Sequence, residues 1–255
     1  MITILSPAKT LDFDSHYDHL PVQVPGHIED SEKVMNKLKK LSKKKIGTLM
    51  SLSKDLVELN AQRYQEWSTD FDKNNSRPAL LAFNGEVYRG IDAKSFTEAE
   101  MQFAENHLRL LSGLHGVLNP LDYIQPYRLE MGTSISIGRR KNLYQFWSEK
   151  VTKDLNHILE QSNSNTLINL ASNEYSKAVN FDKIKGKVIT PVFKDLKNGE
   201  YKVVMTWAKS ARGKMAGFIV RNNINDPQDL IRFDDYKYSE PMSSDSEWVF
   251  VRGVN

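Results

Sequence analysis

The sequence predicts a mixed α/β fold, in which a partly antiparallel sheet is flanked by helices within a single domain spanning residues 1–255. Short apolar runs bounded by turn residues, at 2–5, 80–83, 108–111, 166–170 and 248–251, predict buried strands. Segments with apolar residues at every third or fourth position lie between them and predict helices. Two β-rich runs, 187–194 and 201–207, flank Lys197-Asn198-Gly199, which predicts a hairpin and hence an antiparallel pair.

The composition limits the class of protein. The chain has 255 residues, 40% of them hydrophobic, which is enough for a large core. It has no cysteine, so disulfides, thiolate chemistry and most structural zinc sites are excluded. The first residues lack the pattern of a secretory signal, and no run is long enough to span a membrane. We therefore expect a soluble cytoplasmic protein with no membrane partner and no cofactor.

Charge is unevenly distributed along the chain, although the net charge is only +3. Residues 33–54 include eight lysines and no acidic residue, and residues 194–221 include seven basic and two acidic residues. Residues 222–255 instead carry seven acidic and three basic residues. This segregation predicts a polarised surface that favours association with an anionic partner.

The first strand, residues 2–5, ends at Ser6-Pro7 and is followed by Lys9 and Thr10. Lysine and threonine at a strand exit suit a phosphate, but the glycine-rich loop of a P-loop is missing. A metal hypothesis is raised by a nearby group of histidines and aspartates, namely His16, His19, His27, Asp12, Asp14 and Asp18. Such spacing in a loop is common by chance, so we expect no metal site and rank direct iron binding below the other functions.

Residues 31–67 predict two helices joined by a tight turn. The first has an apolar stripe at Val34, Leu38 and Leu41. Four lysines share another face at the same spacing, namely Lys33, Lys37, Lys40 and Lys44. Ile46-Gly47 predicts an interruption, and Ser53 predicts the N-cap of a second helix. This arrangement suits a phosphate backbone, whereas the alternative is a solvated lysine face.

The predicted strand at 80–83 opens into a glycine-bracketed segment, residues 84–92. We expect it to be a loop that presents Asn84, Tyr88 and Asp92 to a ligand, although Asn-Gly is also an ordinary turn signal. Thr97 and Glu100 then form a capping box for a helix that reaches about residue 107.

The longest irregular stretch, residues 112–133, predicts a shaped loop at the centre of the protein. Gly113, Gly116, Pro120 and Pro126 interrupt regular structure. Hydrogen-bonding side chains lie between these breaks, namely Asp122, Tyr123, Gln125, Tyr127, Arg128 and Glu130. Long loops in compact domains tend to be functional. The alternative is that Arg128 and Glu130 form an internal ion pair among packed tyrosines.

The remaining elements complete the α/β pattern. Residues 142–161 predict an amphipathic core helix, and the strand at 166–170 exits into Ser172, whose expected role is helix capping rather than nucleophilic catalysis. A helix over 208–222 places Lys209, Arg212 and Lys214 near its beginning, which favours an anionic ligand because cations oppose the helix dipole there. Asp226-Pro227 predicts another helix start.

Separated blocks of the chain resemble the YaaA peroxide-stress family. The blocks are Ser6-Pro7-Ala8-Lys9-Thr10-Leu11, Phe83-Asn84-Gly85 with Val87-Tyr88 and Asp92-Ala93, residues 111–133, Asn169-Leu170-Ala171-Ser172 with Glu174-Tyr175, Phe193-Lys194, and Ala211-Arg212-Gly213. They follow one another in order over nearly the whole chain. Two positions depart from the family pattern: His115 replaces the more usual tyrosine, and Asn119 replaces a usual basic residue, which weakens a phosphate contact there.

The resemblance implies a family-specific α/β fold with a helix-hairpin-helix element and a positively charged cleft associated with DNA binding. It also implies protection of DNA and proteins during peroxide stress and lower unincorporated iron. The hairpin element corresponds to residues 41–56, within a lysine-rich lobe at about 31–67.

Two functions follow from these observations. The leading one is binding of double-stranded DNA without sequence specificity, by Lys43, Lys44, Lys45, Lys9, Arg128, Lys194, Lys209, Arg212 and Lys214. The alternative is an enzyme acting on a nucleotide or another phosphorylated small molecule, because polar residues at strand exits mark ligand sites in α/β sheets. Its cleft residues would be Asn84, Tyr88 and Ser172, and its catalytic candidates Arg128, Glu130 and Glu174, with either glutamate as general base.

Overall fold

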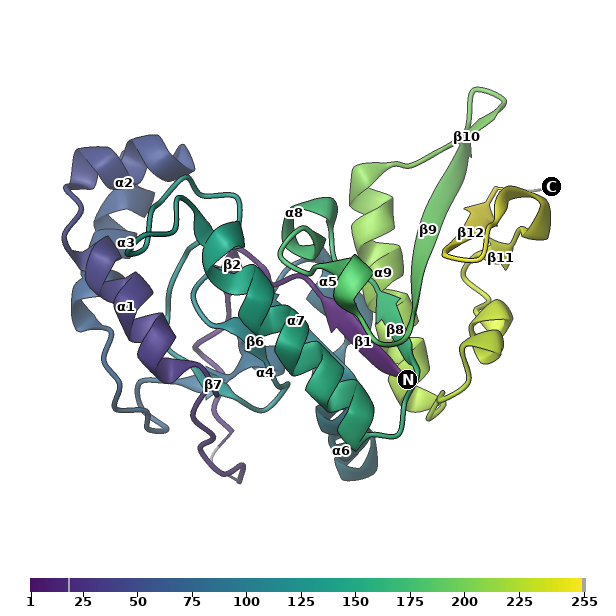
Figure 1. Ribbon diagram of the computed structural model, residues 1–255, viewed down its shortest axis with the longest axis horizontal. Coiled ribbons are helices and arrows are strands. Elements are labelled where there is room, and N and C mark those ends of the chain that lie inside the picture. Colours follow the sequence, from purple (N-terminus) through teal and green to yellow (C-terminus); the bar gives the residue numbers. More distant parts are fainter. Residues whose placement is uncertain (18, 254–255) are drawn as a thin grey trace.

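A mixed sheet forms the centre of the protein, whose computed structural model describes residues 1–17 and 19–253 (Figure 1). Its strands are β1 (Ile2–Leu5), β5 (Leu108–Ser112), β6 (Gly116–Leu118), β8 (Thr166–Asn169), β9 (Lys187–Lys197), β10 (Glu200–Lys202), β11 (Lys237–Tyr238) and β12 (Glu247–Arg252). The order is β11-β12-β9-β8-β1-β5-β6, with β10 paired to β9. β1 is parallel to both β5 and β8, whereas β6, β10 and β11 pair antiparallel with their neighbours. The predicted mixed, partly antiparallel sheet is confirmed.

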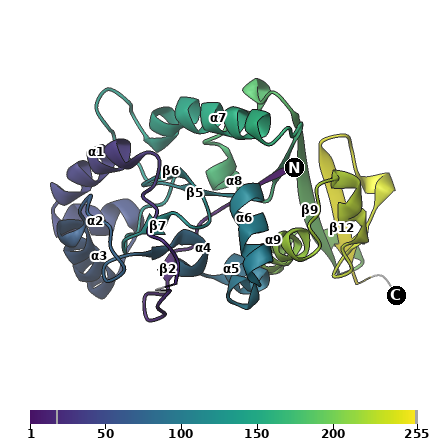
Figure 2. The same ribbon diagram turned by 90° about the horizontal axis from the view of Figure 1, so that it is seen from below.

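Helices cover both faces of the sheet, as Figure 2 shows: α7 lies over one face, and α5, α6 and α9 lie under the other. The helices are α1 (Ile28–Lys39), α2 (Lys43–Met50), α3 (Lys54–Glu66), α4 (Ala79–Ala82), α5 (Glu86–Ile91), α6 (Glu98–His107), α7 (Leu143–Gln161), α8 (Asn173–Ser176) and α9 (Met205–Arg221). Two small antiparallel pairs, β2 (Thr10–Leu11) with β4 (Phe83–Asn84) and β3 (Arg77–Pro78) with β7 (Tyr123–Ile124), tie the connecting segments together. None of the described helices combines the length and apolar content needed to cross a bilayer.

Several predicted elements are confirmed with their local causes. Thr97 and Glu100 form a reciprocal capping box at the start of α6. Asn142 accepts a hydrogen bond from the N–H of Gln145 and caps α7, whose buried face includes Trp147. The hairpin between β9 and β10 turns at Asn198 and Gly199, both of which have positive φ, as that turn requires.

The helical lobe, α1 to α3, differs from its prediction in two ways. α1 ends at Lys39 and Ser42 caps a separate helix α2, so Lys44 does not continue the face of α1 that carries Lys33 and Lys37. The predicted break at Ile46-Gly47 is also wrong, because both residues lie inside α2. A Cβ at Gly47 would lie 3.1 Å from the Val57 side chain, so this glycine serves close packing of α2 on α3. The predicted N-cap at Ser53 is confirmed, and the helix-hairpin-helix element stays a prediction.

Three other predictions of secondary structure are wrong. Residues 80–82 do not form a strand, and only Phe83 of the predicted run belongs to one, the short β4. Ala79–Ala82 form the buried helix α4, because a short Ala-Leu run favours a helical turn and periodicity cannot separate helix from strand in so short a run. Residues 86–91 are helix α5 rather than an open loop. The second hairpin strand stops at Lys202, and Trp207 already belongs to α9.

α5 and α9 approach so closely that their contact requires glycine. A Cβ on Gly213 would lie 1.9 Å from the carbonyl oxygen of Val87, and one on Gly90 would lie 2.7 Å from the carbonyl oxygen of Ser210. Both obstacles are backbone atoms, which cannot rotate away. The helix spacing, and hence the position of every side chain on this face of α9, depends on these two residues.

We predict that Gly213→Ala destabilises the fold, because the added methyl group forces α9 away from α5. Overpacking costs about 1–3 kcal/mol and outweighs the gain in helix propensity of about 1 kcal/mol. The free energy of unfolding, measured in urea, should therefore fall. Gly26→Ala is the matched control, since a Cβ there meets no atom within 4 Å. Equal stability of Gly213→Ala and wild type would contradict the close approach.

Candidate functional site

The site lies where the central strands β1 and β8 end side by side. From β1 the chain crosses through α6 to β5 on one side, and later it crosses through α7 to β8 on the other side. The connection after β1 leads to β5, whereas the connection after β8 leads to β9 on the opposite side, so the segments after β1 and β8 diverge. α6 and α7 cover opposite faces of the sheet (Figure 2). In open α/β sheets, this change of direction opens a crevice beyond the carboxyl ends of the strands.

A pocket of about 270 Å³ occupies this crevice. We call it the β1/β8 pocket. It is lined by residues that follow β1 and β8, by the segment from Asn84 to Tyr88 at the start of α5, and by α9. Seven residues that the sequence singled out line it together, namely Lys9, Asn84, Tyr88, Ser172, Glu174, Lys209 and Arg212. Of the six residues that the enzyme alternative names, four lie together in this pocket, namely Asn84, Tyr88, Ser172 and Glu174, whereas Arg128 and Glu130 do not.

Ser6 holds the ends of β1 and β8 together. Its hydroxyl accepts a hydrogen bond from the N–H of Ser172 at 2.8 Å and donates one to the Ser172 hydroxyl at 3.1 Å. Ser172 occupies the N-cap position of α8, but its side chain makes no capping hydrogen bond, so the expected capping role is wrong. The hydroxyl is turned toward Ser6 instead, and it lies in the pocket wall.

Tyrosines form the deeper wall of the pocket. The Tyr88 hydroxyl is buried and donates to the carbonyl oxygen of Ser6 at 3.0 Å. Burial raises the pKa of Tyr88 and of Tyr175 well above the ordinary value of 10, with the neighbouring Tyr127 adding to both shifts. Both phenols therefore stay neutral. Tyr88 was predicted to contact a ligand from a loop, but its hydroxyl is already used to support Ser6.

Arg128 and Glu130 lie beside the pocket rather than in it. Glu130 Oε2 lies 2.7 Å from Lys9 Nζ, and Glu130 Oε1 lies 3.3 Å from Arg128 Nη2. The internal ion pair that was weighed as the alternative for these two residues is thus present. A small hollow lined by Lys9, Arg128, Glu130 and Tyr175 adjoins the β1/β8 pocket and shares the Lys9 and Tyr175 walls with it.

Arg212 is the one half-buried cation of the β1/β8 pocket. Burial lowers the pKa of its guanidinium, and no charged neighbour offsets that effect. No residue in the described part of the chain accepts a hydrogen bond from it. Lys209, one helical turn earlier on α9, is exposed and likewise forms no ion pair with a described residue.

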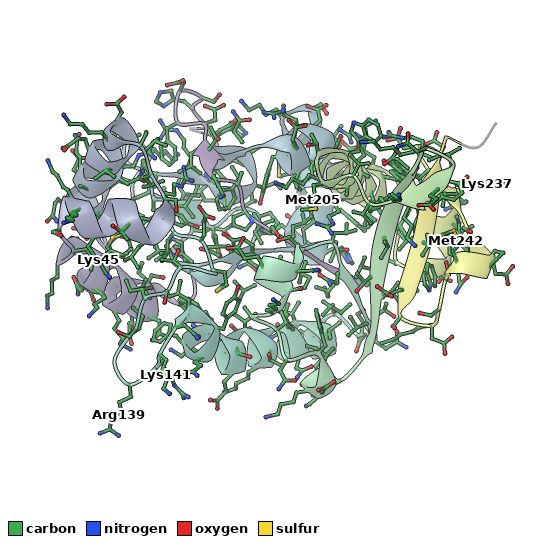
Figure 3. The ribbon with its side chains drawn as sticks, turned by 90° about the horizontal axis from the view of Figure 1, so that it is seen from above. Lys45, Arg139, Lys141, Met205, Lys237 and Met242 are labelled. Atoms are coloured by element: carbon green, nitrogen blue, oxygen red, sulfur yellow. The ribbon has the colours of Figure 1, made fainter. Side chains whose placement is uncertain are left out.

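Other predicted basic residues lie elsewhere. Lys194 on β9 does not line the pocket, and Lys214 pairs with Asp235 at 2.9 Å. Because α9 begins at Met205, Lys214 lies in the middle of that helix and not near its beginning, which corrects the prediction. Lys43, Lys44 and Lys45 belong to α2; Figure 3 shows Lys45 in the helical lobe, well away from Met205 at the start of α9. The predicted basic residues thus occupy separate surfaces.

Two of the three histidines of the metal hypothesis, His16 and His27, are used in other contacts. His27 pairs with Asp154 of α7, and this hydrogen bond raises its pKa. His16 lies 3.3 Å from Arg77 Nη2. Asp18 lies outside the described residues; among residues 1–17 and 19–253, no group of three or more histidines and acids is arranged to hold a metal ion.

Ser6, Glu86 and Tyr175 line the pocket but were not predicted as site residues. Ser6 and Tyr175 belong to the strand exits, so their position after β1 and β8 was the available signal. No such signal marked Glu86, because residues 86–91 were expected to form a loop, whereas they form α5.

The irregular segment 112–133 is held by buried polar groups. The Asp122 carboxylate accepts hydrogen bonds from the Asn119 N–H at 2.8 Å and from its side-chain amide at 3.3 Å. Burial is the largest effect on this group and raises the pKa of Asp122 to about 7. Tyr64 of α3 donates to the carbonyl oxygen of Arg128, which joins this segment to the helical lobe.

Comparison with known proteins gives a consistent result along the chain. A family model described as "Peroxide stress protein YaaA" matches residues 1–242. A UPF0246 protein of Aliivibrio fischeri (strain MJ11) is 48% identical over 254 residues, covering 99% of this chain and 98% of that protein. UPF0246 proteins of Ralstonia pickettii and Teredinibacter turnerae are 48% and 47% identical over 254 residues, covering 99% of both chains in each case.

We predict that Asp122→Asn stabilises the protein increasingly as pH rises. The folded-state pKa of about 7 lies above the ordinary value of 3.8, so the protonated carboxyl favours the folded state. That contribution is complete below pH 3.8 and is lost as pH rises toward 7. Asparagine stays neutral, so the difference in unfolding free energy between variant and wild type should grow between pH 5 and about pH 8.

The measurement is urea unfolding of both proteins across that pH range. Asp182→Asn, an exposed aspartate on the short helix Phe181–Lys183, is the control and should show little dependence on pH. If the difference in unfolding free energy between Asp122→Asn and wild type does not change with pH, burial does not raise the pKa of Asp122.

Proposed function

The chain belongs to the YaaA family of peroxide stress proteins, and from that premise we propose that it protects DNA during peroxide stress by binding duplexes through the lysines of the helical lobe. One observation carries this proposal: residues 33–54 include eight lysines and no acidic residue, and they form the end of α1 and all of α2. Phosphate contacts by lysines supply most of the affinity of sequence-independent DNA binding.

The position of three of these lysines supports a role beyond stability. Lys43, Lys44 and Lys45 form the first turn of α2, where positive charge opposes the helix dipole. All three are exposed, and only Lys43 has a described ionic partner, Glu58. Exposed ion pairs contribute about 0–1 kcal/mol, so Lys43 can exchange Glu58 for a phosphate at little cost. An anionic partner would offset the unfavourable charge at this helix end.

The proposal extends to sequence preference. Lysines contact phosphates as point charges and do not read base edges. We therefore expect similar affinity for random and defined duplexes, together with a steep dependence on salt. In this proposal, the lower unincorporated iron that the family resemblance implies follows from DNA binding. A lysine variant that cannot bind DNA should then fail to lower unincorporated iron in peroxide-treated cells, compared with cells that carry the wild-type chain.

We predict that Lys44→Ala/Lys45→Ala weakens duplex binding and makes it less dependent on salt. Each lost phosphate contact changes the slope of log affinity against log salt by about 0.9, so two contacts change it by about 1.8. Fluorescence anisotropy of a labelled random-sequence duplex, titrated at several salt concentrations, measures both quantities.

The control is Lys183→Ala/Lys185→Ala, which removes the same charge from exposed positions outside the helical lobe. It should keep most of the affinity and the wild-type slope. If both double variants lose affinity equally, the effect comes from net charge and the helical lobe is not the DNA surface.

A further inference from the structure

The β1/β8 pocket has no part in the DNA proposal, because it lies apart from the helical lobe. Surface lysines suffice to hold the phosphates of a DNA backbone. They leave unexplained why polar side chains, among them Asn84, Ser172 and Arg212, gather in this pocket. We propose that this pocket is a second site, which binds a phosphomonoester group through Arg212 and Lys209. This site does not depend on DNA binding by the helical lobe.

The charges of the pocket leave two cations without partners. Glu174 Oε1 accepts a hydrogen bond from the N–H of Gly132 at 3.0 Å, and Glu86 pairs with Arg89. Lys9 is paired with Glu130. The hydrogen bond from Gly132 does not neutralise Glu174, which is the acidic group of the pocket without a described ion-pair partner. Arg212 and Lys209, both on α9, are two cations without one, so an excess of positive charge remains that favours a phosphomonoester, whose charge is about −1.5 to −2 at neutral pH.

Arg212 is half-buried in the pocket wall and has no acceptor among the described residues, which favours an anionic ligand. Desolvating a guanidinium without an acceptor is unfavourable, and buried charges in proteins are normally paired. The close approach of α5 and α9 at Gly213, the next residue, holds Arg212 in this environment. The planar guanidinium offers two parallel N–H groups that match phosphate oxygens. The phosphate therefore supplies the acceptors that the protein itself does not.

Neutral donors surround the same space. The Ser172 hydroxyl accepts from Ser6, so its own hydrogen remains available to a ligand. The Asn84 side chain lies in the pocket and makes no hydrogen bond with a described residue, so its amide is available as well. A phosphate with three terminal oxygens can accept from Arg212, Lys209 and these groups together.

The size of the pocket limits the ligand. Its volume of about 270 Å³ lies just under the range of about 300–1,000 Å³ usual for small-molecule sites. It suits a phosphate with one attached sugar-sized group rather than a dinucleotide. Such a group has two sources: a free sugar phosphate or mononucleotide, and the terminal phosphate of a broken DNA strand.

Calorimetric titration of the full chain with inorganic phosphate, thymidine 5′-monophosphate and thymidine tests the proposal. The two phosphates should bind, and thymidine should not. Arg212→Gln should weaken phosphate binding about tenfold or more, because a charge-assisted hydrogen bond is lost. Lys209→Ala, at an exposed position that carries little risk to folding, should weaken it several-fold. Lys214→Gln, on the same helix but paired with Asp235, should bind like the wild type.

Two further experiments are needed. One distinguishes a small-molecule phosphate from the end of a DNA strand, and the other distinguishes the β1/β8 pocket from the lysines of the helical lobe. A duplex with 5′-phosphate ends is compared with the same duplex ending in 5′-hydroxyls, and a several-fold preference abolished by Arg212→Gln identifies the strand end as the source. Binding of the mononucleotide without that preference identifies a small molecule. The Lys44→Ala/Lys45→Ala protein should keep its affinity for phosphate even if it loses DNA. Failure of the wild type to bind any phosphate probe, or wild-type binding by both Arg212→Gln and Lys209→Ala, overturns the proposal.

Discussion

The hydrogen bond between the Ser172 N–H and the Ser6 hydroxyl, 2.8 Å long, is the contact on which the site depends. It joins the ends of the neighbouring strands β1 and β8, from which the chain leads toward opposite edges of the sheet. The carbonyl of Ser6 is held in turn by the buried hydroxyl of Tyr88. One serine thus ties together two strand exits and α5.

The second constraint is the contact between α5 and α9. Gly213 allows the backbone of α9 to lie against the Val87 carbonyl, and this places its neighbour Arg212 against the pocket wall. A charge in that position loses water without gaining a protein acceptor, which lowers its pKa. Partial desolvation without a protein acceptor does not stabilise the fold. Groups that break the rules of stable packing in this way tend to mark functional sites.

Much of this arrangement could be predicted from sequence, because strand exits are marked by local residues. The apolar run at 2–5 followed by Ser6-Pro7, and the run at 166–170 followed by Ser172, located both sides of the pocket. The rest could not be predicted. Ala79–Ala82 is too short for periodicity to separate helix from strand, and the role of Gly47 appears only when α2 packs on Val57. Likewise, no local pattern reveals that Arg212 lacks an acceptor while Lys214 has one in Asp235.

The two proposals place anion binding on separate surfaces of one fold: the lysines on the exposed α2, and the β1/β8 pocket beyond the sheet. Their separation is the central claim of this account. It is tested most directly by measuring the affinity of the wild-type protein for a labelled duplex with 5′-hydroxyl ends, with and without saturating thymidine 5′-monophosphate at constant ionic strength. If the two sites are separate, the duplex affinity is the same in both cases. Displacement of the duplex by the mononucleotide would show that DNA and phosphomonoester compete for one site and would contradict this separation.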